Sequence, residues 1–118
     1  MTQNNRLQSP IFVKTYDFLV WLLPLTLKFP KSQRFLLAEK LGQMALDFYE
    51  AIIDAVRNSQ DVTRHISEAD QLLYKIRLYL RLSYDLRCIS MGQYEFAVKK
   101  VDELGRLLGG WQKKFKKN

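Results

Sequence analysis

Apolar residues recur at every third or fourth position along nearly the whole chain, which is the spacing that places them on one face of an α-helix. The pattern is interrupted at Phe29-Pro30, at the polar segment Asn58–Asp61 and again near Ser90. No alternation of apolar and polar residues between turn signals supports a β-sheet. Four amphipathic helices with short turns predict an all-α, up-down-up-down four-helix bundle that forms one domain over residues 1–118. The predicted helices span residues 10–28, 32–57, 64–88 and 91–114.

Two of the helix starts carry specific signals. Ser9 precedes Pro10, which is the order of an N-cap residue and a proline at the first helical position. Ser90 and Gln93 have the spacing of a capping box, in which each side chain bonds to the backbone N–H of the other residue. Pro24 lies inside the first helix, where proline removes a backbone donor and costs about 3 kcal/mol. We expect a kink at residues 20–24, and the alternative is a last turn that begins to end at Pro24.

The first and third predicted helices are apolar on more than one face. A surface helix of a lone bundle needs only one buried stripe, so the additional apolar surface predicts contact with another subunit. We therefore expect a homo-oligomer. The residues proposed for its subunit interface are Trp21, Leu22, Leu25 and Tyr79.

The net charge of +7 indicates an acidic partner, with nucleic acid the first candidate and an anionic membrane surface the second. The apolar run at residues 18–25 is shorter than the roughly 20 residues that span a bilayer, so we expect no membrane insertion. The N-terminal segment has no secretion signal, and the single Cys88 cannot form an internal disulfide. These features predict a cytoplasmic protein.

Two arginines and two tyrosines share one strip of the third predicted helix. Tyr74, Arg77, Arg81 and Tyr84 follow one another at spacings of three and four residues. Guanidinium groups bind phosphate and tyrosine rings stack on bases, so the strip is a candidate surface for single-stranded nucleic acid. The alternative is that the arginines form ion pairs within the bundle. Their candidate partners are Asp85, Asp47 and Glu50.

Helix four is the second basic element. Residues 90–118 hold seven Lys or Arg against three acidic residues, a balance of +4 that exceeds half of the net charge. These cations predict phosphate contacts, although lysines at the end of a helix also interact favourably with its dipole. Gly105 and Gly109 lie one turn apart, which favours close packing of a neighbouring helix. The candidate contact residues here are Lys99, Arg106, Lys113, Lys114, Lys116 and Lys117.

Nothing in the sequence predicts catalysis, a cofactor or a small-molecule substrate. The single His65 and single Cys88 exclude the usual clusters of metal ligands. The acidic residues of the second predicted helix are typical of a solvated face. No phosphate-binding loop, nucleophile elbow or zinc-protease motif is present, so we expect a protein that is not an enzyme.

Two segments resemble one known family. Ile76–Leu82 is similar to its LRFWLR segment, and Glu103–Trp111 is similar to its E-x-G-R-x-L-G-x-W segment. Residues 21–25 and 28–31 also resemble the end of that family's first helix. The chain thus resembles the accessory variability determinants of diversity-generating retroelements.

The resemblance implies a homopentameric, barrel-like assembly that binds a reverse transcriptase and its RNA or DNA. Such a protein supports mutagenic retrohoming, the error-prone copying of a template repeat. The matched motifs carry over Arg77, Arg81 and Arg106. The proteins encoded in ribosomal-RNA intervening sequences are a broader related group, but they carry an N-I-A-E-G signature where this chain has YEAIIDA at residues 49–55. A structural oligomer whose basic patches only maintain solubility is a third alternative.

Overall fold

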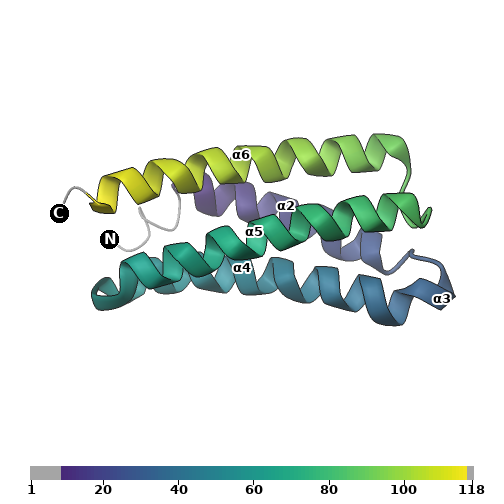
Figure 1. Cartoon of the computed structure of the whole chain (residues 1–118), viewed down its shortest axis with the longest axis horizontal. Coiled ribbons are helices and arrows are strands. Elements are labelled where there is room, and N and C mark those ends of the chain that lie inside the picture. Colours follow the sequence, from purple (N-terminus) through teal and green to yellow (C-terminus); the bar gives the residue numbers. More distant parts are fainter. Residues whose placement is uncertain (1–8, 117–118) are drawn as a thin grey trace.

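The computed structural model describes residues 9–116, in which four long helices run alternately up and down (Figure 1). They are α2 (Pro10–Thr26), α4 (Glu39–Arg57), α5 (Val62–Asp85) and α6 (Met91–Lys116). The short segments α3 (Lys31–Gln33), η1 (Arg34–Ala38) and η2 (Ser59–Asp61) connect them. Within these residues there is no strand, so the predicted all-α fold is confirmed, and the arrangement is a four-helix bundle.

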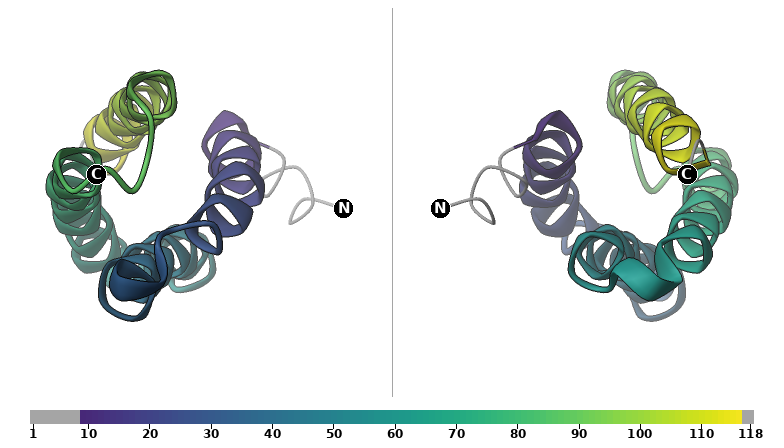
Figure 2. Two further views of the ribbon diagram at one scale, coloured as in Figure 1. Left: turned by 90° about the vertical axis from the view of Figure 1, so that its right-hand side faces the viewer. Right: turned by 90° about the vertical axis from the view of Figure 1, so that its left-hand side faces the viewer.

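Seen along its length, the four long helices follow one another around the core in chain order, with α2 opposite α5 (Figure 2). Helix α2 contacts both α4 and α6. Side chains from α2 and α6 pack against each other. Phe12 packs edge-on against Trp111 with ring centroids 5.6 Å apart, and Lys14 pairs with Glu103 at 3.8 Å.

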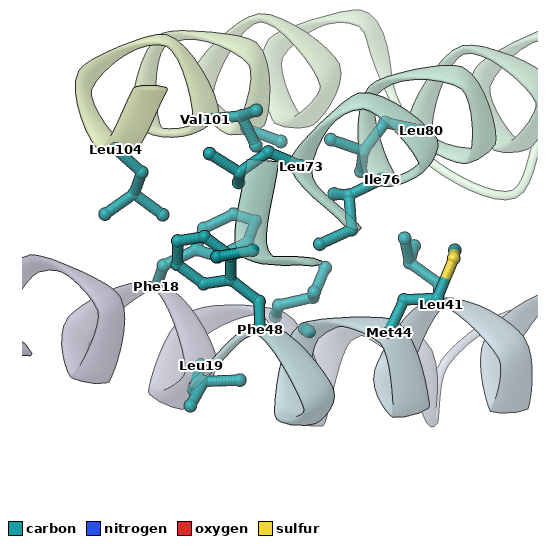
Figure 3. Close-up of a cluster of buried hydrophobic side chains, with 14 of the residues drawn as sticks. Phe18, Leu19, Leu41, Met44, Phe48, Leu73, Ile76, Leu80, Val101 and Leu104 are labelled. Carbon is teal, nitrogen blue, oxygen red and sulfur yellow. The ribbon is translucent and has the colours of Figure 1, made fainter. Parts of the chain in front are cut away.

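All four long helices contribute to one hydrophobic core, which is shown in Figure 3. Phe48 of α4 lies among aromatic and aliphatic side chains from the other helices. Burial of each such side chain is worth about 1.5–3 kcal/mol, so the core accounts for the alignment of the helix faces. The labelled members are Phe18, Leu19, Leu41, Met44, Phe48, Leu73, Ile76, Leu80, Val101 and Leu104.

The second predicted helix, residues 32–57, is in fact composite. After α3, residues Arg34–Ala38 form a π-helical turn before α4 begins at Glu39. In this turn Leu37 is buried, whereas Phe35 is 80% exposed. A π turn is wider than an α turn. The helical residues after the turn are therefore rotated about the helix axis relative to those before it. Apolar periodicity alone does not reveal such a turn.

The structure favours the second of the two interpretations of Pro24. Helix α2 ends at Thr26 rather than Lys28. The N–H groups of Leu27, Lys28 and Phe29 donate to carbonyls three residues earlier, at 3.2, 3.0 and 3.2 Å. The chain therefore tightens into consecutive turns directly after the proline, and Pro24 lies in the last turn of the helix.

Helix α5 ends at Asp85, three residues before the predicted end. Arg87 has a left-handed φ of 63°. Its N–H donates to the Tyr84 carbonyl at 2.9 Å, and the Cys88 N–H donates to the Ser83 carbonyl at 2.8 Å. These two bonds form a Schellman motif, which usually has glycine at the left-handed position. An arginine there gave no signal in the sequence.

The predicted capping box at the start of α6 is confirmed. The Ser90 N–H donates to Gln93 Oε1 at 2.8 Å, and the Gln93 N–H donates to Ser90 Oγ at 3.1 Å. Pro10 is the first residue of α2, as predicted. Ser9 occupies the N-cap position, but its hydroxyl makes no hydrogen bond within the part of the chain that the structure describes.

Candidate functional site

The two sequence segments that carry the family resemblance meet between α5 and α6. The guanidinium of Arg77 on α5 donates to the carboxylate of Asp102 on α6. A Cβ atom placed on Gly105 would lie only 3.3 Å from Arg77 Nη2. Gly105 therefore leaves room for the guanidinium, and what approaches this glycine is a side chain rather than a neighbouring helix backbone.

Arg81 forms its ion pair within its own helix. Its Nε donates to both carboxylate oxygens of Asp85, at 3.1 Å each. The pKa of Arg81 is raised by the hydrogen bond and charge of Asp85, and further by Tyr94. Both arginines are thus ion-pair members, but neither side chain is deeply buried: 39% of the Arg77 side chain and 65% of the Arg81 side chain are exposed. Asp85 was among the predicted partners, whereas Asp102 takes the place of Asp47 and Glu50.

The predicted strip of two tyrosines and two arginines divides into two parts. Tyr74 is exposed on α5. The ring of Tyr84 is half-buried and stacks on Tyr94 of α6, with centroids 5.0 Å apart and planes at 18°. Tyr94 covers one face of the Tyr84 ring, so a base could stack only on its other face, and the nucleic-acid contact of Tyr84 stays a prediction.

The outward face of α6 carries a shallow groove of about 370 Å³. Each of its two carboxylates is paired with a cation from another helix: Asp102 with Arg77, and Glu103 with Lys14. Within residues 9–116, neither Lys99 nor Arg106 forms an ion pair. The groove therefore has a net positive charge. Its lining residues are Phe96, Lys99, Lys100, Asp102, Glu103 and Arg106.

The basic face continues toward the end of α6. Lys113 and Lys114 are exposed, Lys116 is the last residue of the helix, and Lys117 lies outside the described residues. A Cβ atom on Gly109 or Gly110 would meet no atom within 4 Å. These two glycines are therefore not required for packing within the subunit, contrary to the expectation for Gly109.

The residues predicted for the subunit interface occupy different environments. Leu22 is fully buried in the core of its own subunit, which corrects its assignment, because its side chain already packs between the helices. Trp21 is half-buried, and its ring contacts those of Phe18 and Phe96. Leu25 and Tyr79 are also half-buried.

Two exposed apolar stripes lie on α2 and α5, the helices for which additional apolar surface was predicted, but they consist of other residues than the four predicted for the subunit interface. One follows α2 and its end, and the other follows α5, where every fourth residue is apolar and exposed. This spacing was visible in the sequence, but apolar periodicity does not distinguish a core face from an exposed one. The stripes consist of Val13, Tyr16, Val20 and Leu27, and of Tyr74, Leu78, Leu82 and Leu86.

Other chemically interesting groups do not assemble into a site. Cys88 is partly buried, which raises the pKa of its thiol. His65 is buried, and its Nδ1 lies 3.8 Å from Glu68 Oε2. Among residues 9–116, no three His, Cys, Asp or Glu side chains are placed to hold a metal ion together.

No individual helix in the described part of the chain has both the length and the apolar character to cross a membrane. Pro10–Thr26 and Lys31–Arg57 are long and apolar enough only when they are taken together, and the chain bends by 118° between them.

Comparison with known proteins identifies the family. The sequence matches the family model described as bAvd-like over residues 11–115. Among curated proteins, no match is found. The matched region includes both the Ile76–Leu82 and the Glu103–Trp111 segments, which meet where the Arg77 guanidinium lies beside Gly105. Because the match extends over most of the chain, this protein belongs to the bAvd-like family of accessory variability determinants.

Proposed function

We propose that this protein is a non-catalytic accessory subunit of a diversity-generating retroelement. In this role it binds the element's reverse transcriptase together with RNA or DNA and supports mutagenic retrohoming. Family membership supports the association with such an element. The observation that carries the nucleic-acid function is the uncompensated positive charge of the α6 groove, where Asp102 and Glu103 are paired with cations from other helices.

Phosphate groups are the natural partners of this charge. Arginine offers a planar fork to phosphate oxygens, and lysine a mobile point charge. Arg106 and Lys99 lie seven residues apart on α6, so they are separated by about 10 Å along the helix axis. Contacts from a row of exposed cations give binding that depends on salt and little on sequence.

The assembly proposed for this function is a homopentameric ring. The apolar stripes of α2 and α5 lie on helices at opposite sides of the subunit (Figure 2). From Val13 to Leu27 and from Tyr74 to Leu86, they extend about 21 and 18 Å, respectively. Two different stripes of matching length suit a head-to-tail contact, in which α2 of one subunit packs against α5 of the next. Such a contact forms a ring when the rotation between subunits closes.

Co-purification tests the retroelement assignment. The gene is expected to lie beside a reverse-transcriptase gene that is flanked by imperfect template and variable repeats. The protein should co-purify with that polymerase from cells that express both. A polymerase that does not bind the folded wild-type protein, with or without RNA, contradicts the assignment and leaves the two alternatives, an intervening-sequence-type protein and a structural oligomer.

A further inference from the structure

We propose that Phe96, in the groove of α6, is the stacking platform for an unpaired base of single-stranded RNA or DNA. This inference rests on the proposed nucleic-acid function and specifies the form of nucleic acid that the groove accepts. Phe96 was not among the contact residues predicted from the sequence, because those of the fourth predicted helix are all basic.

The platform is an aromatic series that extends from the core to the surface. Phe18 is 3% exposed, and its ring stacks on Trp21 with centroids 6.3 Å apart and planes at 22°. Trp21 in turn contacts the ring of Phe96, with centroids 4.7 Å apart and planes at 43°. Phe96 is 41% exposed. Because the series is held at its inner end by the core, the outer ring is already positioned, and binding requires little additional ordering.

Lys100 lies over the Phe96 ring, with its Nζ 5.3 Å from the centroid. A cation–π contact at an exposed site is weaker than the stacking of a base on an aromatic side chain. The lysine stem is long and flexible, so an arriving base can displace the ammonium group from the ring. The displaced ammonium then remains near the phosphate attached to that base. Lys99 and Arg106 provide the cations for the neighbouring phosphates.

Stacking on Phe96 selects single strands, because the bases of a duplex are already stacked on their neighbours. A duplex would have to extrude a base before it could use the ring, which costs unpairing and unstacking energy. A duplex can still contact the lysines through its phosphates, so it is expected to bind by charge alone.

A second copy of the chain is the alternative occupant of the groove. The groove between α4 and α5 is lined by Asp47, Glu50, Asp54 and Glu68, and it could face basic residues of another subunit. The lining of the Phe96 groove argues against this occupant. All of its other lining residues are charged, whereas the centres of subunit interfaces are depleted in charged residues, lysine in particular.

The test compares Phe96→Leu with Phe35→Leu. Both changes remove an exposed aromatic ring and retain an aliphatic side chain, but Phe35 lies in η1, away from the groove. Fluorescence anisotropy is measured with labelled oligouridine, with oligodeoxythymidine and with a hairpin duplex. Phe96→Leu should weaken binding of at least one single strand by about fivefold or more. It should change hairpin affinity less than twofold, and Phe35→Leu should behave as the wild type. The response of the two single strands shows whether the base belongs to RNA, DNA or both.

An optical measurement tests the contact directly. The chain has two tryptophans, so Trp111→Phe leaves Trp21 as the only reporter, next to Phe96. Binding of a single strand should quench its fluorescence, and binding of the hairpin should not. Native mass spectrometry of Phe96→Leu shows whether the subunit number is retained.

Three results would overturn the inference. If Phe96→Leu binds single strands as tightly as the wild type does, the groove binds through charge alone, and the proposed function survives without the platform. If the variant loses its oligomeric state, the groove is a subunit interface. If the wild-type protein binds no nucleic acid at low salt, the nucleic-acid function fails together with the platform.

Discussion

The guanidinium of Arg77 lies so close to Gly105 that a Cβ atom on the glycine would be 3.3 Å from Nη2. The same guanidinium donates to Asp102, three residues before the glycine. Glycine inside a helix costs about 1 kcal/mol relative to alanine. At position 105 the absence of a Cβ atom leaves room for the Arg77 guanidinium beside its partner Asp102.

Alanine substitutions at two glycines of α6 should therefore differ. Gly110→Ala should stabilise the protein by about 1 kcal/mol, because its Cβ would meet no atom within 4 Å. Gly105→Ala should stabilise the protein less, because the Arg77 guanidinium must move away from its present position. Urea unfolding measures both changes. In an Arg77→Ala background, Gly105→Ala should raise the free energy of unfolding as much as Gly110→Ala does. Equal increases for the two single variants would contradict the proposed contact.

Arg77→Ala should cost only about 0–1 kcal/mol of stability, because the ion pair with Asp102 is partly exposed. A deeply buried pair would cost roughly 3–5 kcal/mol when one partner is removed. The double variant Arg77→Ala and Arg81→Ala should remain folded, as measured by thermal unfolding. If it does not fold, the arginines are structural residues, and their proposed contact with a partner is wrong.

A substitution at the left-handed residue that follows α5 should stabilise the protein. Arg87 has a φ of 63°, a conformation that glycine adopts without strain. Arg87→Gly should raise the free energy of unfolding by roughly 0.5–1 kcal/mol, after allowance for the greater freedom of glycine in the unfolded chain. The comparison variant is Arg57→Gly, which places glycine in the last turn of α4 and should destabilise the protein. A loss of stability in Arg87→Gly would contradict this explanation.

These cases show which features the sequence could predict. The side chains of Ser90 and Gln93 bond to each other's backbone N–H across three residues, so their capping box followed from spacing alone. Helix faces were predictable for the same local reason. The partner of Arg77 is 25 residues away and depends on the rotation of α6 about its axis. Apolar periodicity gives that rotation only approximately, so the prediction named the wrong acidic residues.

The exposed stripes illustrate the same limit. Leu22 and Leu82 are both leucines in amphipathic helices, yet Leu22 is fully buried and Leu82 is exposed. The difference depends on which neighbouring helix covers each face. The arrangement of the four helices around the core, with α2 opposite α5, is a tertiary property that no local pattern contains.

A charge placed in either apolar stripe should disrupt the proposed ring. Val20→Asp on α2 and Leu82→Asp on α5 should each convert the oligomer to monomers while the helices remain folded, because both side chains are exposed in the isolated subunit. Native mass spectrometry and far-ultraviolet circular dichroism measure the two properties. Phe35→Asp, outside both stripes, should retain the wild-type assembly. A wild-type protein that is monomeric at micromolar concentration would rule out the ring.

The salt dependence of nucleic-acid binding tests the central claim most directly. Affinity for a labelled single strand is measured between about 50 and 200 mM salt for the wild type, for Lys99→Gln with Arg106→Gln, and for Lys40→Gln with Lys75→Gln. Both double variants remove two positive charges, but Lys75 lines the acidic groove between α4 and α5. If the α6 groove contacts phosphates, the first double variant should reduce the slope of log affinity against log salt by about 1.4, and the second should leave it nearly unchanged. Equal slopes for all three proteins, or no binding by the wild type at the lowest salt, would contradict the account.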